Sequence, residues 1–185
     1  KWFREISIKD VPLVGGKNAS LGEMYSNLAS CGVPVPNGFA LTCKGYEYFL
    51  AHNGLKKIIS ELLSHIDSEK KDLELIGREV RSRILGAEIP SDLAQEVIFM
   101  YDELLDGTPK HVAVRSSATV EDSPLHSFAG QFETSLMVFG NSDLLYHIKN
   151  CFASLFTDRA ISYRMDMGYD LFSIGMSVGV QTMVR

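Results

Sequence analysis

Apolar residues recur along much of this chain every three to four positions, and this spacing predicts helices. The first predicted helix begins at Asn18 or Ser20 and stops at Gly32, and the second begins at Thr42 and breaks at Asn53-Gly54. Two more helices cover residues 55–65 and 67–85. A fifth has Pro90 at its first position and ends at Leu105, and a sixth follows Gly140. The last helix carries an apolar stripe from Leu144 to Phe156 and is predicted to continue through Arg164. The simplest interpretation of Arg164 is a surface group that compensates the helix dipole.

Shorter apolar runs predict strands at Phe39–Thr42, His111–Val114, Thr134–Phe139 and Ile174–Val184. In the last run Val178 and Val180 face one way, while Gly179 and Gln181 face the other. Helices and strands together predict an α+β (α/β) fold. Residues 43–108 offer no recognisable chemistry and are predicted to form a mainly helical sub-lobe, whereas residues 111–185 are the strand-rich part.

Arg115 is the first candidate for chemistry, because the predicted strand ends just before it. Ligands gather at strand ends in many α/β sheets, and Ser116, Ser117 and Thr119 add hydroxyl groups nearby. A fixed cation with hydroxyls beside it suits a polyphosphate. The alternative is an arginine held by Asp122 for structural reasons alone, and composition does not separate the two interpretations.

A second candidate is the turn Gly15-Gly16-Lys17, which opens directly onto a predicted helix. The N-terminus of a helix favours anions, because its free N–H groups and its dipole point at them. The turn is not a Walker A loop, since Lys17 is followed by Asn18 and not by Ser or Thr. Taken alone, the turn is better explained as a helix entry with a solvated lysine than as an anion site. Gln181, a polar residue on its strand face, is a further candidate for contact with a ligand.

Composition narrows the classes of partner. The 185 residues carry a formal net charge of −5, which argues against a nucleic-acid-binding surface. The three cysteines are far apart and show no metal-ligand spacing, so free thiols in the cytoplasm are expected. No apolar run approaches the ~20 residues that span a bilayer, so we expect no membrane partner. The chain begins without Met and stops inside a strand-like run, which suggests a piece of a longer protein.

Several longer motifs carry a family resemblance, which covers essentially the whole chain. They are Val14–Met24, Gly32–Phe39, Val114–Thr119, Ser127–Gln131 and Phe152–Arg164. Together they closely resemble the N-terminal nucleotide-binding domain of the phosphoenolpyruvate synthases, within the wider pyruvate phosphate dikinase family. The resemblance is weakest over residues 55–108. Phe132, Ser135 and Leu125-His126 depart from the usual family residues, which affects fine nucleotide contacts.

The resemblance implies that residues 1–185 are an incomplete ATP-grasp domain, in which two lobes clamp ATP. Lys17 and Arg115 match family residues that contact the phosphates, and Arg115 matches one that also stabilises the transferring group. Gly130, Thr134 and the neighbouring Ser135 match a loop and strand that close over the nucleotide, and Gln181 matches a residue near the adenine or ribose. The family's Mg²⁺ ligands would lie beyond Arg185, so Glu121, Asp122 and Glu133 are interpreted as orienting or structural groups.

The resemblance also implies a reaction for the longer protein. Phosphate would pass from ATP to a histidine in a separate domain, and then to pyruvate in a C-terminal domain, yielding phosphoenolpyruvate, AMP and phosphate. None of the five histidines here matches that histidine, so the isolated chain is expected to be inactive. Two alternatives stay open: a related dikinase or antibiotic phosphotransferase with another acceptor, and a non-catalytic nucleotide-binding module.

Overall fold

The fold is built on a four-stranded antiparallel sheet, seen in a computed structural model that describes residues 1–67, 69–108, 110–119, 122–123, 126–127, 133–170 and 172–183. Its strands are, in spatial order, β1 (Gly38–Leu41), β6 (Met176–Thr182), β2 (Val112–Ala118) and β5 (Thr134–Val138). A separate two-stranded sheet pairs β3 (Asp122–Ser123) with β4 (His126–Ser127). This mixture of helices and antiparallel strands confirms the predicted α+β class, whereas a complete two-lobed ATP-grasp domain stays a prediction.

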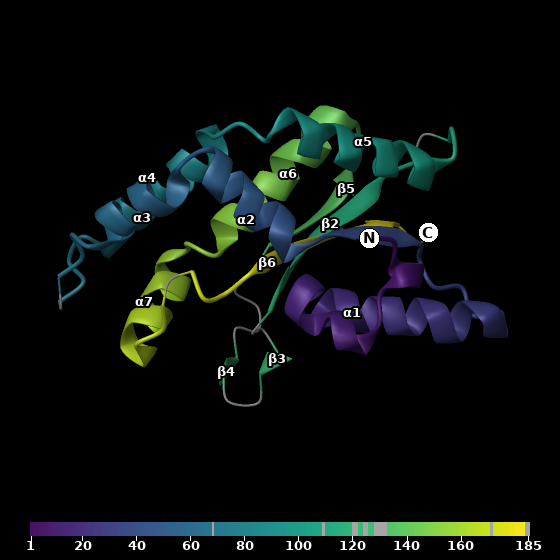
Figure 1. The fold of residues 1–185 in the computed structure, drawn as a ribbon, viewed down its shortest axis with the longest axis horizontal. Coiled ribbons are helices and arrows are strands. Elements are labelled where there is room, and N and C mark those ends of the chain that lie inside the picture. Colours follow the sequence, from purple (N-terminus) through teal and green to yellow (C-terminus); the bar gives the residue numbers. More distant parts are fainter. Residues whose placement is uncertain are drawn as a thin grey trace.

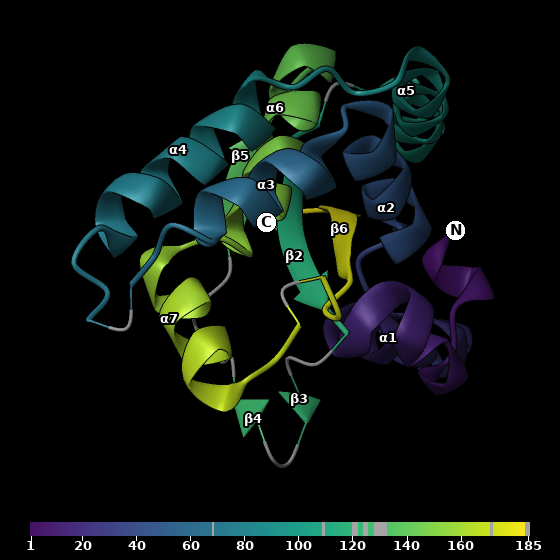
Figure 2. The same ribbon diagram turned by 60° about the vertical axis from the view of Figure 1, so that its left-hand side comes forward.

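The helices divide between the two faces of the sheet (Figures 1 and 2). One side carries α2 (Cys43–His52), α3 (Leu55–Leu63), α4 (Leu73–Gly86), α5 (Ser91–Leu105), α6 (Asn141–Ser154) and α7 (Asp158–Met167). The other side carries α1 (Val11–Leu28), with the short 3-10 turns η1 (Phe3–Glu5), η2 (Ile8–Asp10) and η3 (Ala29–Cys31) at its ends. We call the second side the α1 face.

Alternation along the two central strands decides which residues meet which helices. Val114 of β2 and Val180 of β6 are cross-strand partners, and both are fully buried in the main core. That core also takes Phe49 from α2 and Phe152 from α6, whose rings lie 5.2 Å apart. Because neighbours along a strand point to opposite faces, the intervening residues turn toward α1. The predicted division of β6 into a valine face and a Gly179/Gln181 face is therefore confirmed.

Several predicted element boundaries were wrong; α1, for example, begins at Val11 and not at Asn18 or Ser20. The helix expected from residue 67 begins at Leu73, because Lys70 adopts the left-handed conformation (φ 55°) and breaks the helix before it. Pro90 is the N-cap of α5, so the helix begins at Ser91, one position later than expected. The single helix expected after Gly140 is two helices, because Thr157 caps a new one by accepting a hydrogen bond from the Ala160 N–H at 3.3 Å.

Arg164 also differs from its predicted surface position, since only 1% of the residue is exposed. Its guanidinium donates to the carbonyl oxygens of Leu155 and Ala160, and it stacks over the Phe156 ring at 5.0 Å from the ring centroid. Burial lowers the pKa of Arg164 to about 10, so it is still charged at neutral pH. Leu155 is the C-cap of α6, where carbonyls lack helical partners. Arg164 therefore joins the end of α6 to α7.

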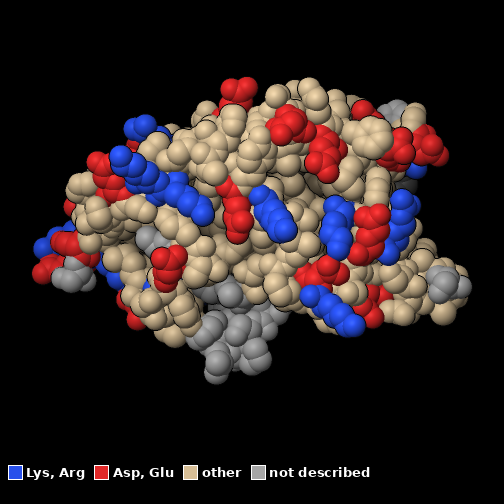
Figure 3. Space-filling model, in the orientation of Figure 1, with Lys and Arg blue, Asp and Glu red and all other residues tan. Residues whose placement is uncertain are grey.

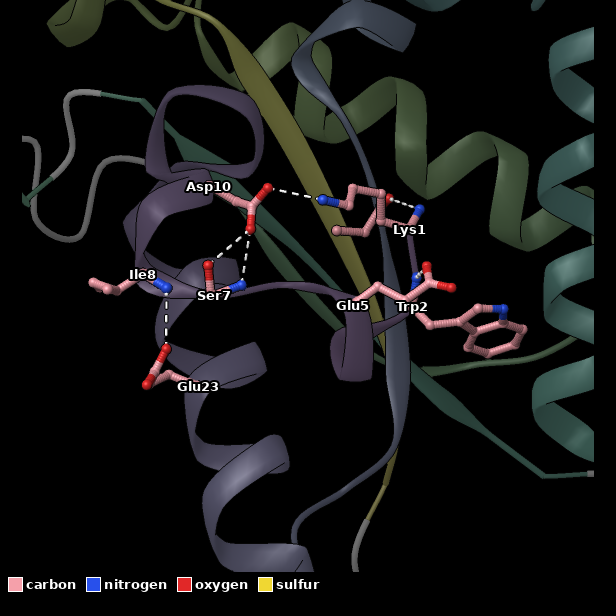
Figure 4. Close-up of polar contacts among 8 residues, drawn as sticks. Lys1, Trp2, Glu5, Ser7, Ile8, Asp10 and Glu23 are labelled. Carbon is pink, nitrogen blue, oxygen red and sulfur yellow. Dashed lines mark hydrogen bonds and ion pairs between the residues drawn. The ribbon is translucent and has the colours of Figure 1, made fainter.

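The N-terminal segment is fastened to both β1 and α1 (Figure 4). The Ala40 N–H donates to the Lys1 carbonyl at 2.8 Å, and Trp2 forms an isolated antiparallel β-bridge with Phe39. The segment therefore lies along the outer edge of β1. Asp10 accepts hydrogen bonds from the Ser7 N–H at 2.9 Å and from Lys1 Nζ at 2.8 Å. These bonds hold the pKa of Asp10 below its usual value, with the Lys1 bond the largest cause.

We expect Asp10→Asn to destabilise the chain slightly at neutral pH, by about 1 kcal/mol or less, because the ion pair is partly exposed. A carboxyl with a lowered folded pKa stabilises the fold above its unfolded pKa of 3.8, and this contribution disappears as the pH falls through the lower folded pKa. Urea unfolding of both proteins at pH 7 and at pH 3 should therefore show the difference shrinking in acid. Glu103→Gln, at an exposed site on α5, should change neither value. An equal loss at both pH values would contradict this account.

Within the described residues, no helix combines the length and the apolar character needed to cross a bilayer.

Candidate functional site

The α1 face is made largely of small residues, which lets α1 lie close to the sheet. A side chain at Gly179 would place its Cβ 2.3 Å from Asn18 Oδ1, and one at Gly15 would place its Cβ 2.4 Å from Ser117 Oγ. Gly15 also has a φ of 72°, which other residues rarely adopt, and it divides α1 into two helical segments. The glycine turn predicted from the sequence is thus the point where α1 bends against β2.

Asn18 fastens the second segment of α1 to three strands. Its backbone N–H donates to Ser117 Oγ of β2 at 3.2 Å. Its side-chain Nδ2 donates to Ser177 Oγ of β6 at 3.0 Å, and that hydroxyl donates in turn to the Leu41 carbonyl of β1 at 2.7 Å. The first N–H groups of a helix have no partner inside the helix, so Ser117 satisfies one of them. Lys17, which is half-buried, is thereby held beside the centre of the sheet.

Strand register brings three of the predicted site residues onto this same face. Arg115 lies opposite Gly179 on one side and Thr134 on the other, and Gln181 lies opposite Ala113. Directly opposed residues of antiparallel strands share a face. Arg115, Thr134 and Gln181 therefore all lie on the α1 face, together with the α1 turn that carries Lys17. Arg115 is in the middle of β2 and not at its end, because the strand runs on to Ala118.

Three buried polar atoms on the α1 face have no hydrogen-bond partner among the residues that the structure describes. They are Arg115 Nε, Gln181 Oε1 and Asn18 Oδ1. A buried polar group left unpaired costs about 1–3 kcal/mol, so native proteins rarely keep several of them together without a purpose. The arrangement can offer a donor with positive charge and two acceptors to a bound molecule.

One predicted site residue, Ser135, does not join this group. Ser135 lies opposite Val114, whose side chain is in the main core, so Ser135 is on the helical side of the sheet. There it lines a cavity of about 850 Å³ between α4 and α6, with Arg81 and His147. Gly130 lies outside the described residues, as does Glu121.

The described ranges hold no metal-binding cluster, and two of the three cysteines are buried. No group of three or more His, Cys, Asp or Glu side chains comes together there in a way that could hold a metal ion. Burial raises the pKa of the Cys43 and Cys151 thiols to about 12 in each case, which keeps them protonated and unreactive at neutral pH. Glu133 is exposed, beside the start of β5.

The outer surface mixes charges of both signs, as Figure 3 shows for the side seen in Figure 1. On α4 the charges pair along the helix, with Arg78 bound to Glu74 at 2.7 Å and Arg83 to Glu79 at 2.6 Å. Such exposed pairs contribute little to stability. Arg115, by contrast, is a cation on a central strand and has no ion pair among the described residues.

Reasoning from the sequence had treated Asn18 only as a candidate helix cap and had not singled out Ser177. The signal that could have found them is the pair Ser177-x-Gly179 on one face of β6. Small residues at alternate strand positions indicate that another part of the backbone approaches closely on that face. The position of the partner on α1 depends on contacts between residues far apart in sequence.

Comparison with known proteins gives one consistent result. The family model for the pyruvate phosphate dikinase AMP/ATP-binding domain matches residues 11–185. Over the whole chain, the sequence is 50% identical to a phosphoenolpyruvate synthase of Aquifex aeolicus, 48% to one of Helicobacter pylori and 46% to one of Escherichia coli. The chain spans only 22%, 23% and 24% of the length of these relatives.

Proposed function

Because the chain belongs to the family of pyruvate phosphate dikinase AMP/ATP-binding domains, we propose that its α1 face binds ATP. In this proposal Arg115 and Lys17 contact the phosphates, Thr134 lies beside Arg115, and Gln181 faces the adenine or ribose. One observation carries it: the unpaired Arg115 Nε and Gln181 Oε1 lie on the same face of adjacent strands, next to the turn that holds Lys17. A nucleotide suits this face, since its phosphate oxygens can accept hydrogen bonds from the Arg115 guanidinium, and its ribose or adenine groups can donate to Gln181 Oε1.

The chemistry of phosphoryl transfer suits such a face. Transfer requires little covalent help from a protein, and depends on positioning and on cations around the transferring group. A strand in the centre of a sheet fixes the Arg115 backbone, so the cation needs little rearrangement when ATP binds. Mg²⁺ would neutralise charge between the phosphates, and we propose that its ligands lie outside the described residues.

We further propose that the longer protein is a phosphoenolpyruvate synthase, because the relatives that match the whole chain carry that name. It would pass phosphate from ATP through a phosphohistidine to pyruvate, yielding phosphoenolpyruvate, AMP and phosphate. The histidine and pyruvate domains would lie in the part of the relatives that this chain does not cover. The isolated chain would then bind nucleotide without turning it over. A cytoplasmic location fits its free cysteines.

We expect Lys17→Ala to weaken binding of MgATP to the full-length protein by at least about tenfold, because a hydrogen bond to a charged group contributes roughly 1.5–3 kcal/mol. Calorimetric titration of the wild type and the variant measures this. Lys9→Ala is the matched control, since it removes the same charge from an exposed position on η2, just before α1. Equal affinities of the Lys17 and Lys9 variants would remove Lys17 from the proposed site.

A further inference from the structure

Asn18 is a fully buried side chain whose two polar ends have different environments. The Ser177 hydroxyl has a single proton and donates it to the Leu41 carbonyl, so toward Asn18 it can only accept. The amide nitrogen of Asn18 must therefore be the end that faces Ser177, at 3.0 Å. This fixes the orientation of the amide and leaves the carbonyl oxygen Oδ1 directed at Gly179.

Arg115 approaches the same glycine from the neighbouring strand. The position that a Gly179 Cβ would occupy is 2.3 Å from Asn18 Oδ1 and 3.5 Å from Arg115 Cγ. Within the described part of the chain, Oδ1 is a buried acceptor without a donor, and Arg115 Nε is a buried donor without an acceptor. The two groups are chemically complementary and flank one residue that has no side chain to separate them.

We propose that Asn18 is a positioning residue for Arg115: it accepts the Nε–H of Arg115 when the nucleotide is bound. The inference rests on the proposed function. Pairing Nε with Asn18 would hold the plane of the guanidinium and leave its terminal N–H groups free for phosphate oxygens. Asn18 would in this way link the turn that carries Lys17 to the strand that carries Arg115.

The competing explanation is that Asn18 serves only as an anchor through Ser177. The two explanations predict different couplings between residues. If Asn18 acts through the Arg115 Nε–H, its removal has little effect once Arg115 is replaced by lysine, which keeps the charge but has no Nε–H donor in a planar guanidinium. If Asn18 is only an anchor, its removal has the same effect in either background.

A double-mutant cycle in the full-length protein tests this, with Asn18→Ala, Arg115→Lys and the double variant, and with MgATP affinity measured by calorimetry. We expect Asn18→Ala to weaken binding about tenfold when Arg115 is present, as for a lost hydrogen bond to a charged group, and less than about twofold when it is lysine. Ser177→Ala, which removes the anchor and keeps Oδ1, should weaken binding less than Asn18→Ala. Equal effects of Asn18→Ala in both backgrounds would overturn the proposal.

A second measurement does not depend on how well the variants fold. In a structure of the wild-type full-length protein with a non-hydrolysable ATP analogue, Arg115 Nε should lie within about 3.2 Å of Asn18 Oδ1. An Nε atom bound to the nucleotide or to another residue would reject the proposal. If the wild type binds no MgATP at all, the proposed function fails. If it binds MgATP and the Arg115 variant weakens binding, but the cycle shows no coupling, only the role of Asn18 fails.

Discussion

Replacing Arg115 by alanine in the full-length protein is expected to reduce transfer of phosphate from ATP to the protein by about 10³-fold or more. An arginine that neutralises the transferring phosphate contributes a factor of roughly 10³–10⁵ in phosphotransfer enzymes. The effect should be large because Arg115 is fixed on a central strand, where water cannot easily take its place. Incorporation of label from ATP marked in its β- and γ-phosphates measures it.

The same variant separates the proposed role from a structural one. A structural arginine stabilises the fold, so its loss would lower the unfolding temperature together with the activity. Arg115 keeps a buried, unpaired Nε, and its removal should leave stability unchanged or slightly improved. Arg78→Ala, on the exposed surface of α4, is the control for loss of an arginine elsewhere. Wild-type labelling in Arg115→Ala would exclude Arg115 from the reaction.

Replacing Arg164 by alanine is expected to lower the free energy of unfolding of the chain by about 3–4 kcal/mol. The variant would leave a cavity beside Phe156 and would remove the guanidinium donor from the Leu155 carbonyl at the end of α6. A buried carbonyl without a donor is costly. Arg81 still binds the Phe156 carbonyl and Asp158 at this junction, each at 2.7 Å, so the loss is partial. Denaturant unfolding followed by circular dichroism gives the value.

Two further variants identify the cause. Arg159→Ala, five positions earlier on α7 and exposed, should have almost no effect. Arg164→Met keeps most of the volume and removes the charge. A base whose folded pKa is lowered, here from 12.5 to about 10, destabilises the fold at every pH below about 10. Methionine avoids that cost, so Arg164→Met should fall between the wild type and alanine. A loss for Arg159→Ala as large as for Arg164→Ala would contradict this account.

The local pattern of apolar residues predicted which helices and strands form better than it predicted where each one begins and ends. The spacing of apolar residues identified the helices and strands, because one face of each is buried. The ends depend on details that periodicity does not contain, such as the left-handed Lys70 before α4 or the cap at Thr157. Arg164 was wrongly predicted at the surface for a related reason. An arginine near a helix end is usually a surface group, and only the position of the end of α6 shows that Arg164 is buried against it.

For the candidate site, the family resemblance supplied residues, and the register of the strands showed which of them share a face. Arg115, Thr134 and Gln181 come together because β2 pairs with both β5 and β6. Ser135, one residue further along, turns to the other side of the sheet. Asn18 could not be found by either route, because the orientation of its amide depends on Ser177, 159 positions away, which in turn donates to the Leu41 carbonyl.

The order of strands in the sheet has a consequence for synthesis on the ribosome. β6 is the last strand in the sequence, yet it lies between β1 and β2 and pairs with both. Until residues 176–182 have left the exit tunnel, β1 lacks its inner neighbour, and the arginine strand is joined only to β5. Contacts between such distant parts of a chain form slowly. The face that we propose for nucleotide is therefore completed only when β6 joins the sheet, and a nascent chain that stops short of it lacks Ser177, Gly179 and Gln181 on that face.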